Sequence, residues 1–176
     1  MGATRLDENP GCLRRLLGLG PVNKPAPQAE ARGPRPIDEA YSLRTSLLSE
    51  NEMSFYQQLR IVVGEKYVIF AKVRLADIFA VAKTSSYSQH LSDSNRIDTR
   101  HVDFVVCEAE TLKPTFVVEV DDQTHNTPKR QKIDAFKNDL FSIYGLKLIR
   151  FPAKWEYSPE VIREGIKRAF QKAHGQ

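Results

Sequence analysis

The spacing of apolar and polar residues divides the chain near residue 43. Downstream of this point, segments with helical or strand periodicity follow one another, separated by turn residues. The pattern predicts a helix from Ser49 or Asn51 to Gly64, a strand over 67–73, a short helix from 75 followed by a solvent-exposed loop through 85–95, strands over 101–107 and 115–121, a helix over 128–144, a strand over 146–151, and a last helix from 158.

The order of these elements predicts an α/β fold of the form α-β-β-β-α-β-α. Three consecutive strands pair most simply as antiparallel neighbours. A strand that follows a helix can return parallel to an earlier strand through a crossover. We therefore expect a mixed sheet of about four strands flanked by helices in three layers.

Residues 1–42 have a different composition. Prolines recur at positions 10, 21, 25, 27, 34 and 36. Each proline fixes φ and removes a backbone donor, which prevents a helix or sheet from propagating. The sequence predicts a disordered, proline-rich arm over 1–42 and a folded domain over 43–176.

Composition narrows the class of protein. Apolar residues make up 41% and charged residues 27% of the chain, as in globular proteins. The net charge of +4 allows a polyanionic partner without establishing one. The two cysteines, Cys12 and Cys107, form neither a disulfide framework nor a zinc motif, which favours a cytoplasmic location. We expect no membrane span, because no apolar stretch approaches the roughly 20 residues required.

Acidic residues inside otherwise apolar strands are the most informative feature. Asp103 interrupts a run of strand formers, and Glu119 and Asp121 are two residues apart, so that they share one face of a strand. Buried carboxylates need a partner, and oxygen ligands suit Mg²⁺ or Mn²⁺. We expect the three acids to meet at a metal site. The alternative is that Glu119 and Asp121 are solvated or pair with Arg130 or Lys132.

Other candidate residues surround these acids. His125, four residues after Asp121, suits a general acid or base, although a loop histidine is commonly an ordinary surface residue. Arg130 and Lys132 open a helix whose N-terminus attracts phosphate, or they form a solvated face. Glu52 is a further candidate ligand, but helix-dipole and capping effects explain a first-turn acid equally well.

Several blocks of sequence resemble a known family. They are SENEMSFYQQL (49–59), KVRLADIF (72–79), NRIDTRHVDFVV (95–106), VVEVDDQTH (117–125), PKRQKIDAF (128–136) and GLKLIRF (145–151). Together they look like a bacterial family of uncharacterised domains within the restriction-endonuclease-like, or PD-(D/E)XK, superfamily, similar to very-short-patch-repair endonucleases.

The resemblance implies a Mg²⁺-dependent deoxyribonuclease in which Asp103, Glu119 and Glu52 bind metal, with Asp121 assisting. Asp121 stands where the motif lysine is expected, so His125, Arg130 or Lys132 would replace it. The expected function is metal-dependent phosphodiester hydrolysis of DNA. The alternatives are a catalytically inactive nucleic-acid-binding module of the same fold and a protein-interaction domain.

Overall fold

A four-stranded mixed sheet lies at the centre of the domain in the computed structural model, which describes residues 33–83, 86–121 and 127–171. The strands are β1 (Tyr67–Arg74), β2 (His101–Glu108), β3 (Pro114–Asp121) and β4 (Lys147–Pro152), in the spatial order β1-β2-β3-β4. β2 pairs antiparallel with both β1 and β3, whereas β4 is parallel to β3. The predicted mixed sheet is confirmed.

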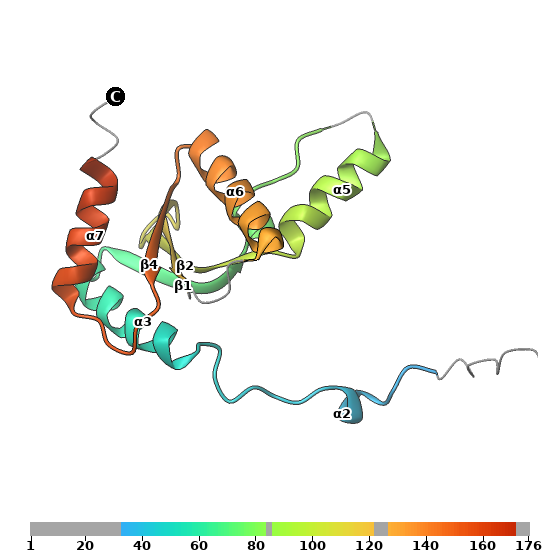
Figure 1. Cartoon of the computed structure of the whole chain (residues 1–176), viewed down its shortest axis with the longest axis horizontal. Coiled ribbons are helices and arrows are strands. Elements are labelled where there is room, and N and C mark those ends of the chain that lie inside the picture. The colour runs from blue at the N-terminus through green and yellow to red at the C-terminus, as the bar shows by residue number, and fades with distance from the viewer. Residues whose placement is uncertain (1–32, 84–85, 122–126, 172–176) are drawn as a thin grey trace, which may run out of the picture. The chain divides into compact units, whose positions relative to one another are not determined.

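Helices cover both faces of the sheet, as Figure 1 shows. The helices α3 (Glu50–Val63) and α7 (Pro159–Gln171) pack on one face. On the other face lie α4 (Leu75–Ile78), α5 (Tyr87–Asp98) and α6 (Pro128–Ile143). The predicted three layers are therefore present.

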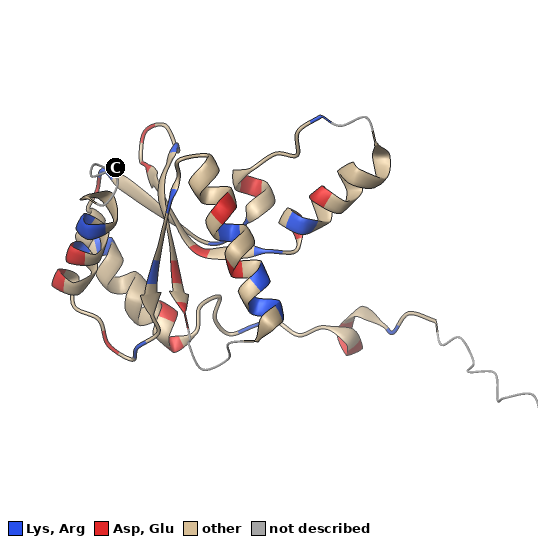
Figure 2. Ribbon diagram, turned by 45° about the horizontal axis from the view of Figure 1, so that its top comes forward, with Lys and Arg blue, Asp and Glu red and all other residues tan. Residues whose placement is uncertain are grey.

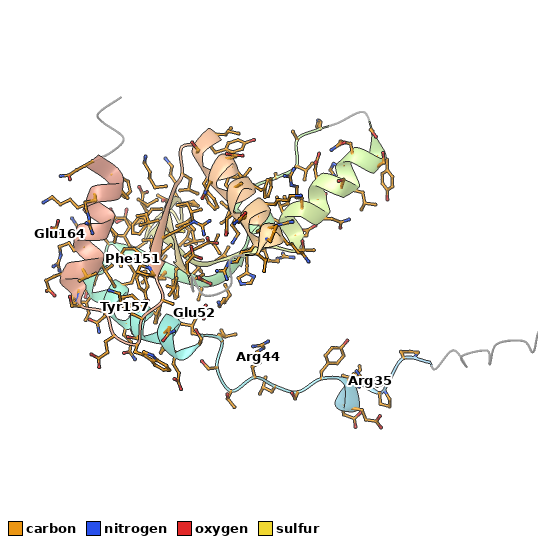
Figure 3. The ribbon with its side chains drawn as sticks, viewed as in Figure 1. Arg35, Arg44, Glu52, Phe151, Tyr157 and Glu164 are labelled. Atoms are coloured by element: carbon orange, nitrogen blue, oxygen red, sulfur yellow. The ribbon has the colours of Figure 1, made fainter. Side chains whose placement is uncertain are left out.

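The core under α3 and α7 is built largely from aromatic rings. Phe55 of α3 is fully buried and contacts Phe104, Phe151 and Tyr157. A Cβ atom at Gly165 would lie 2.5 Å from a ring carbon of Phe151, so only glycine allows α7 to approach β4 this closely. Figure 3 shows Phe151 and Tyr157 beside α3.

Capping interactions fix the ends of the helices that border the later site. Ser49 and Glu52 form a capping box at the start of α3, and Gly64 ends this helix with φ of 67°. Thr127 caps α6, and Pro128 occupies its first turn. The predicted starts of both helices are confirmed.

The predicted solvent-exposed loop through 85–95 is wrong, because residues 87–98 form α5. Only Ile97 of this helix is buried, so the hydrophobic periodicity that usually reveals a helix is missing. Local interactions stabilise the helix instead. The Ser86 side chain caps it, and Gln89 donates a hydrogen bond to Asp93 one turn later at 3.0 Å.

The chain divides into two units, Met1–Leu43 and Arg44–Gln176. Within the described part of the first unit, Ile37–Ala40 forms the short helix α2. The prediction of a disordered arm falls mainly on residues 1–32, which lie outside the described residues, and it stays a prediction. Among the helices that the structure describes, none has both the length and the apolar character required to cross a membrane.

Candidate functional site

A cleft of about 400 Å³ lies where β2 begins and β3 ends. The four acids predicted as metal ligands, Glu52, Asp103, Glu119 and Asp121, all line it. Basic side chains from β1 and α6 line it as well. Figure 2 shows acidic residues on β3, and basic residues on β4 and at the start of α6. The sheet and the start of α3 therefore bring the predicted acids together, beside several cations.

Lys72 joins two of the acids. Its Nζ atom lies 2.5 Å from Glu52 Oε1 and 3.0 Å from Asp103 Oδ1. Burial alone would lower the pKa of Lys72, but its hydrogen bonds to the two carboxylates outweigh burial and raise the pKa. Burial would likewise raise the pKa of Glu52, and the Lys72 and Ser49 hydrogen bonds outweigh it and lower the pKa. Lys72 is therefore held as an ammonium ion between two carboxylates.

The backbone of β1 changes face at Lys72. Ala71 and Val73 are two residues apart and would share a face in a regular strand, yet they pack in the cores on opposite sides of the sheet. Lys72 has φ of 56°, in the left-handed region that residues with a Cβ atom avoid. This strained conformation produces the change of face at the residue that contacts Glu52 and Asp103.

Asp103 holds β3 where its regular pairing with β2 ends. The final pair of the β2–β3 ladder toward the cleft joins Phe104 and Val118. Beyond this pair, Asp103 Oδ2 accepts a hydrogen bond from the Val120 backbone N–H at 2.9 Å. The carboxylate thus takes the place of a ladder carbonyl and satisfies a β3 donor at the edge of the cleft.

Glu119 is the most deeply buried acid of the cleft, with 3% of its surface exposed. Lys137 of α6 donates a hydrogen bond to its Oε1 atom, and a second one to the His101 carbonyl. Arg150 Nη1 lies 2.8 Å from Glu119 Oε2, but Oε2 accepts no hydrogen bond from the described residues. Burial raises the pKa of Glu119 despite Lys137 and Arg150, so the charged form is incompletely compensated.

Asp121 belongs to a more exposed network. Its Oδ2 atom lies 2.7 Å from Arg150 Nη1, and its Oδ1 atom lies 3.4 Å from Arg130 Nη2. Arg150 also contacts Asp134 of α6 at 3.3 Å. Hydrogen bonding to Asp121 and the nearby acids raise the pKa of Arg150 against the opposing effect of burial.

The structure brings most of the predicted residues together, though not all. Arg130 lines the cleft and pairs with Asp121, as the alternative interpretation of the acids expected. Lys132 is exposed and does not line the cleft. His125 lies outside the described residues, and its role stays a prediction. Glu52 both caps α3 and contacts Lys72, so its two interpretations hold together.

The acids form two pairs around separate cations. Lys72 lies between Glu52 and Asp103, whereas Arg150 lies between Glu119 and Asp121. Over residues 33–83, 86–121 and 127–171, no group of three or more His, Cys, Asp or Glu side chains is arranged to hold a metal ion. The described side chains therefore do not form a preformed metal cage.

Sequence reasoning missed Lys72, Lys137, Arg150 and Asp134. A charged residue within an apolar strand is the signal that identified Asp103. The same signal was available for Lys72 and Arg150. Asp134 and Lys137 lie one and two turns after Arg130 on the same side of α6, a spacing that a helical projection would have shown.

Together, fold and site define a mixed α/β domain with a charged cleft at the carboxyl ends of its two parallel strands. Residues 44–169 match the family described as "Protein of unknown function (DUF2726)", and the chain belongs to this family. Comparison with curated proteins and with solved structures gave no match.

Proposed function

We propose that the chain is a metal-dependent phosphodiesterase that acts on DNA, with a restriction-endonuclease-like centre of the PD-(D/E)XK type. One observation carries this proposal. Asp103 of β2 and Glu119 of β3 line the same cleft as two lysines, Lys72 and Lys137, that contact them. Carboxylates that bind a cation, next to ammonium groups that bind phosphate, are one arrangement that catalyses phosphodiester hydrolysis.

The residues fit Mg²⁺ bound jointly with substrate. Mg²⁺ usually keeps several waters and binds through one or two carboxylates plus substrate phosphates, so it needs no three-residue cage. Glu119 Oε2 is buried, accepts no hydrogen bond from the described residues and lies 2.8 Å from Arg150 Nη1, and it would provide one ligand atom if Arg150 moved aside. Asp103 Oδ1, whose hydrogen bond among the described residues comes from the Lys72 side chain, would provide another. Bound Mg²⁺ would lower the pKa of a water molecule and neutralise phosphate charge.

Lys72 and Lys137 are candidates for the role of the lysine that Asp121 replaces. The raised pKa of Lys72 keeps its Nζ protonated at neutral pH, so it would stabilise negative charge on the phosphate and would not take a proton from water. Lys137 Nζ, fixed by the His101 carbonyl and Glu119, would orient the Glu119 carboxylate.

The start of α6 would bind the phosphate backbone. Thr127 caps this helix of 16 residues, and its positive N-terminal dipole favours an anion. Arg130 lies on the side facing the cleft, and Lys132 is exposed on the same helix. His125, in the segment before the helix, would carry the proton between water and leaving group.

Plasmid nicking tests the proposal. The purified full chain is incubated with supercoiled plasmid and Mg²⁺ or Mn²⁺, beside Asp103→Asn, Glu119→Gln and the control Glu160→Gln. Asn at 103 keeps an acceptor for the Val120 N–H but loses the charge. Glu160 is an exposed acid of α7 that does not line the cleft. We expect Asp103→Asn and Glu119→Gln to lower the rate by about 100-fold or more, and Glu160→Gln to leave it unchanged.

The ion pairs within the cleft favour a second candidate, a nucleic-acid-binding module without catalysis. Each of the four acids already contacts a lysine or arginine of the chain. This candidate predicts salt-sensitive DNA binding that a chelator does not affect, and no nicking with either metal. Wild-type protein that nicks no plasmid under any of these conditions rejects catalysis, and salt-sensitive binding in the same samples would then support the module.

A further inference from the structure

An exposed tryptophan lies close to the cleft and has no role in the proposed hydrolysis. Trp155 is the only tryptophan of the chain, and 75% of its surface is exposed. Its segment follows β4, whose last residue Pro152 pairs with Asp121 of the cleft. The next residue, Ala153, donates its backbone N–H to the Asp121 carbonyl at 2.8 Å. Two residues of chain span at most about 7 Å, so the Trp155 backbone lies within about 7 Å of Ala153, which contacts the backbone of the cleft residue Asp121.

The loop that carries Trp155 is fixed by one hydroxyl group. Tyr157 Oη donates a hydrogen bond to the Pro152 carbonyl at 2.8 Å and accepts one from the Lys154 backbone N–H at 2.8 Å. The Tyr157 ring in turn packs edge-on against the buried Phe55, with ring centroids 5.0 Å apart. The structure thus presents Trp155 on a preorganised loop, and a ligand that contacts it does not have to order that loop first.

The surroundings of Trp155 are better suited to binding a single flat ring than to binding the apolar surface of another protein. Its sequence neighbours Lys154 and Glu156 are both charged and exposed, so Trp155 does not extend into an apolar patch along the chain. An aromatic side chain in a polar setting, beside a cleft with several cations, is the arrangement by which proteins bind unpaired nucleobases while basic groups hold the phosphates.

We propose that Trp155 stacks on an unpaired nucleobase of a DNA strand whose phosphate backbone enters the cleft. The inference rests on the proposed function, and it specifies the substrate class as single-stranded or locally unpaired DNA. Tyr157 is a positioning residue in this proposal, because its hydroxyl holds the loop while Trp155 makes the contact.

The single tryptophan makes the test direct. The emission of the full chain is recorded while a 20-nucleotide oligothymidylate, or a mixed-sequence duplex of the same length, is added in EDTA and in Mg²⁺. We expect the oligothymidylate to quench the emission to a plateau, since stacking on a base alters the surroundings of the indole. Affinities come from the anisotropy of fluorescently labelled strands, which also reports on variants that lack tryptophan.

Variants separate stacking from general effects. Trp155→Ala should weaken oligothymidylate binding by about 5- to 150-fold, with a smaller loss for Trp155→Phe. Tyr157→Phe keeps the indole and should weaken binding less than Trp155→Ala. Tyr87→Ala removes another exposed aromatic ring, which is 81% exposed at the start of α5, and should change nothing.

The possible failures are distinct. If the oligothymidylate bound without changing the tryptophan emission, and Trp155→Ala bound it as tightly as the wild type, the stacking would be overturned. The proposed function would be left standing. If Trp155→Ala weakened binding of the duplex but not of the oligothymidylate, the assignment to unpaired bases would be overturned. Absence of binding to either DNA, together with absence of plasmid nicking, would reject the proposed function and the stacking with it.

Discussion

The strained backbone at Lys72 gives a sharp prediction about stability. Replacing Lys72 by alanine or by glycine removes the same ammonium group, so the loss of the Glu52 and Asp103 contacts cancels when the two variants are compared. What remains is the backbone. A Cβ atom in the left-handed region costs about 1–2 kcal/mol, and glycine avoids this cost. The greater freedom of glycine in the unfolded chain opposes this gain by roughly 0.5–1 kcal/mol.

The Lys72→Gly variant should therefore be more stable than Lys72→Ala by about 0.5–1 kcal/mol. In a domain of this size, that difference corresponds to a shift in Tm of about 2–4 °C. Urea unfolding and thermal unfolding of the two variants, measured side by side, provide the check. The expected order is unusual, because a protein with glycine inside a strand is normally less stable than the same protein with alanine there.

Lys147 at the start of β4 supplies the matched control. It is a strand lysine whose φ is not positive, so Lys147→Gly should be less stable than Lys147→Ala. A Lys72→Ala variant that equals or exceeds Lys72→Gly in stability would refute the reasoning. The left-handed conformation would then not be the source of strain.

Two further predictions concern Glu119. Burial holds the pKa of Glu119 above the ordinary value of 4.5, so the protonated form of Glu119 favours the folded state. This contribution to the free energy of unfolding is present below pH 4.5 and is lost as the pH rises through the folded-state pKa. Urea midpoints of wild type and Glu119→Gln between pH 4 and 8 should therefore diverge in favour of the variant as the pH rises, and a constant difference would contradict this. Lys137→Met should destabilise the domain by about 3 kcal/mol, because the Glu119 carboxylate stays buried with Arg150 as its remaining partner. The double variant Glu119→Gln/Lys137→Met should recover much of that loss in urea unfolding, whereas strictly additive effects would show that the two residues do not interact.

The regular elements could be predicted because their buried residues recur with clear periods. The strands around Val105 and Val117 and the helix of Phe55 and Leu59 all bury one face or both. The helix α5 could not be predicted in this way, because it buries only Ile97 and depends on capping and local side-chain pairs. Periodicity reports burial, and a helix without a buried face leaves no periodic signal.

The four acids of the site were predicted from the sequence, whereas Arg130 was the one predicted cation that lines the cleft. Asp103 and Glu119 stood out because a carboxylate within an apolar strand needs a partner. Their partners Lys72 and Lys137 come from distant parts of the chain, so the sequence does not show which cation contacts which acid. The left-handed conformation of Lys72 had no signal, since nothing about a lysine in a strand indicates positive φ.

The change of face in β1 also affects how the domain meets other molecules. β1 lies at an edge of the sheet, so one row of its backbone donors and acceptors has no strand partner among the described residues. Such a row is a template on which a foreign strand can assemble. The left-handed residue interrupts that template near the end of the strand, and a second chain would meet side chains that change face there. Lys72, which contacts the two acids, would therefore also hinder the pairing of a foreign strand with β1.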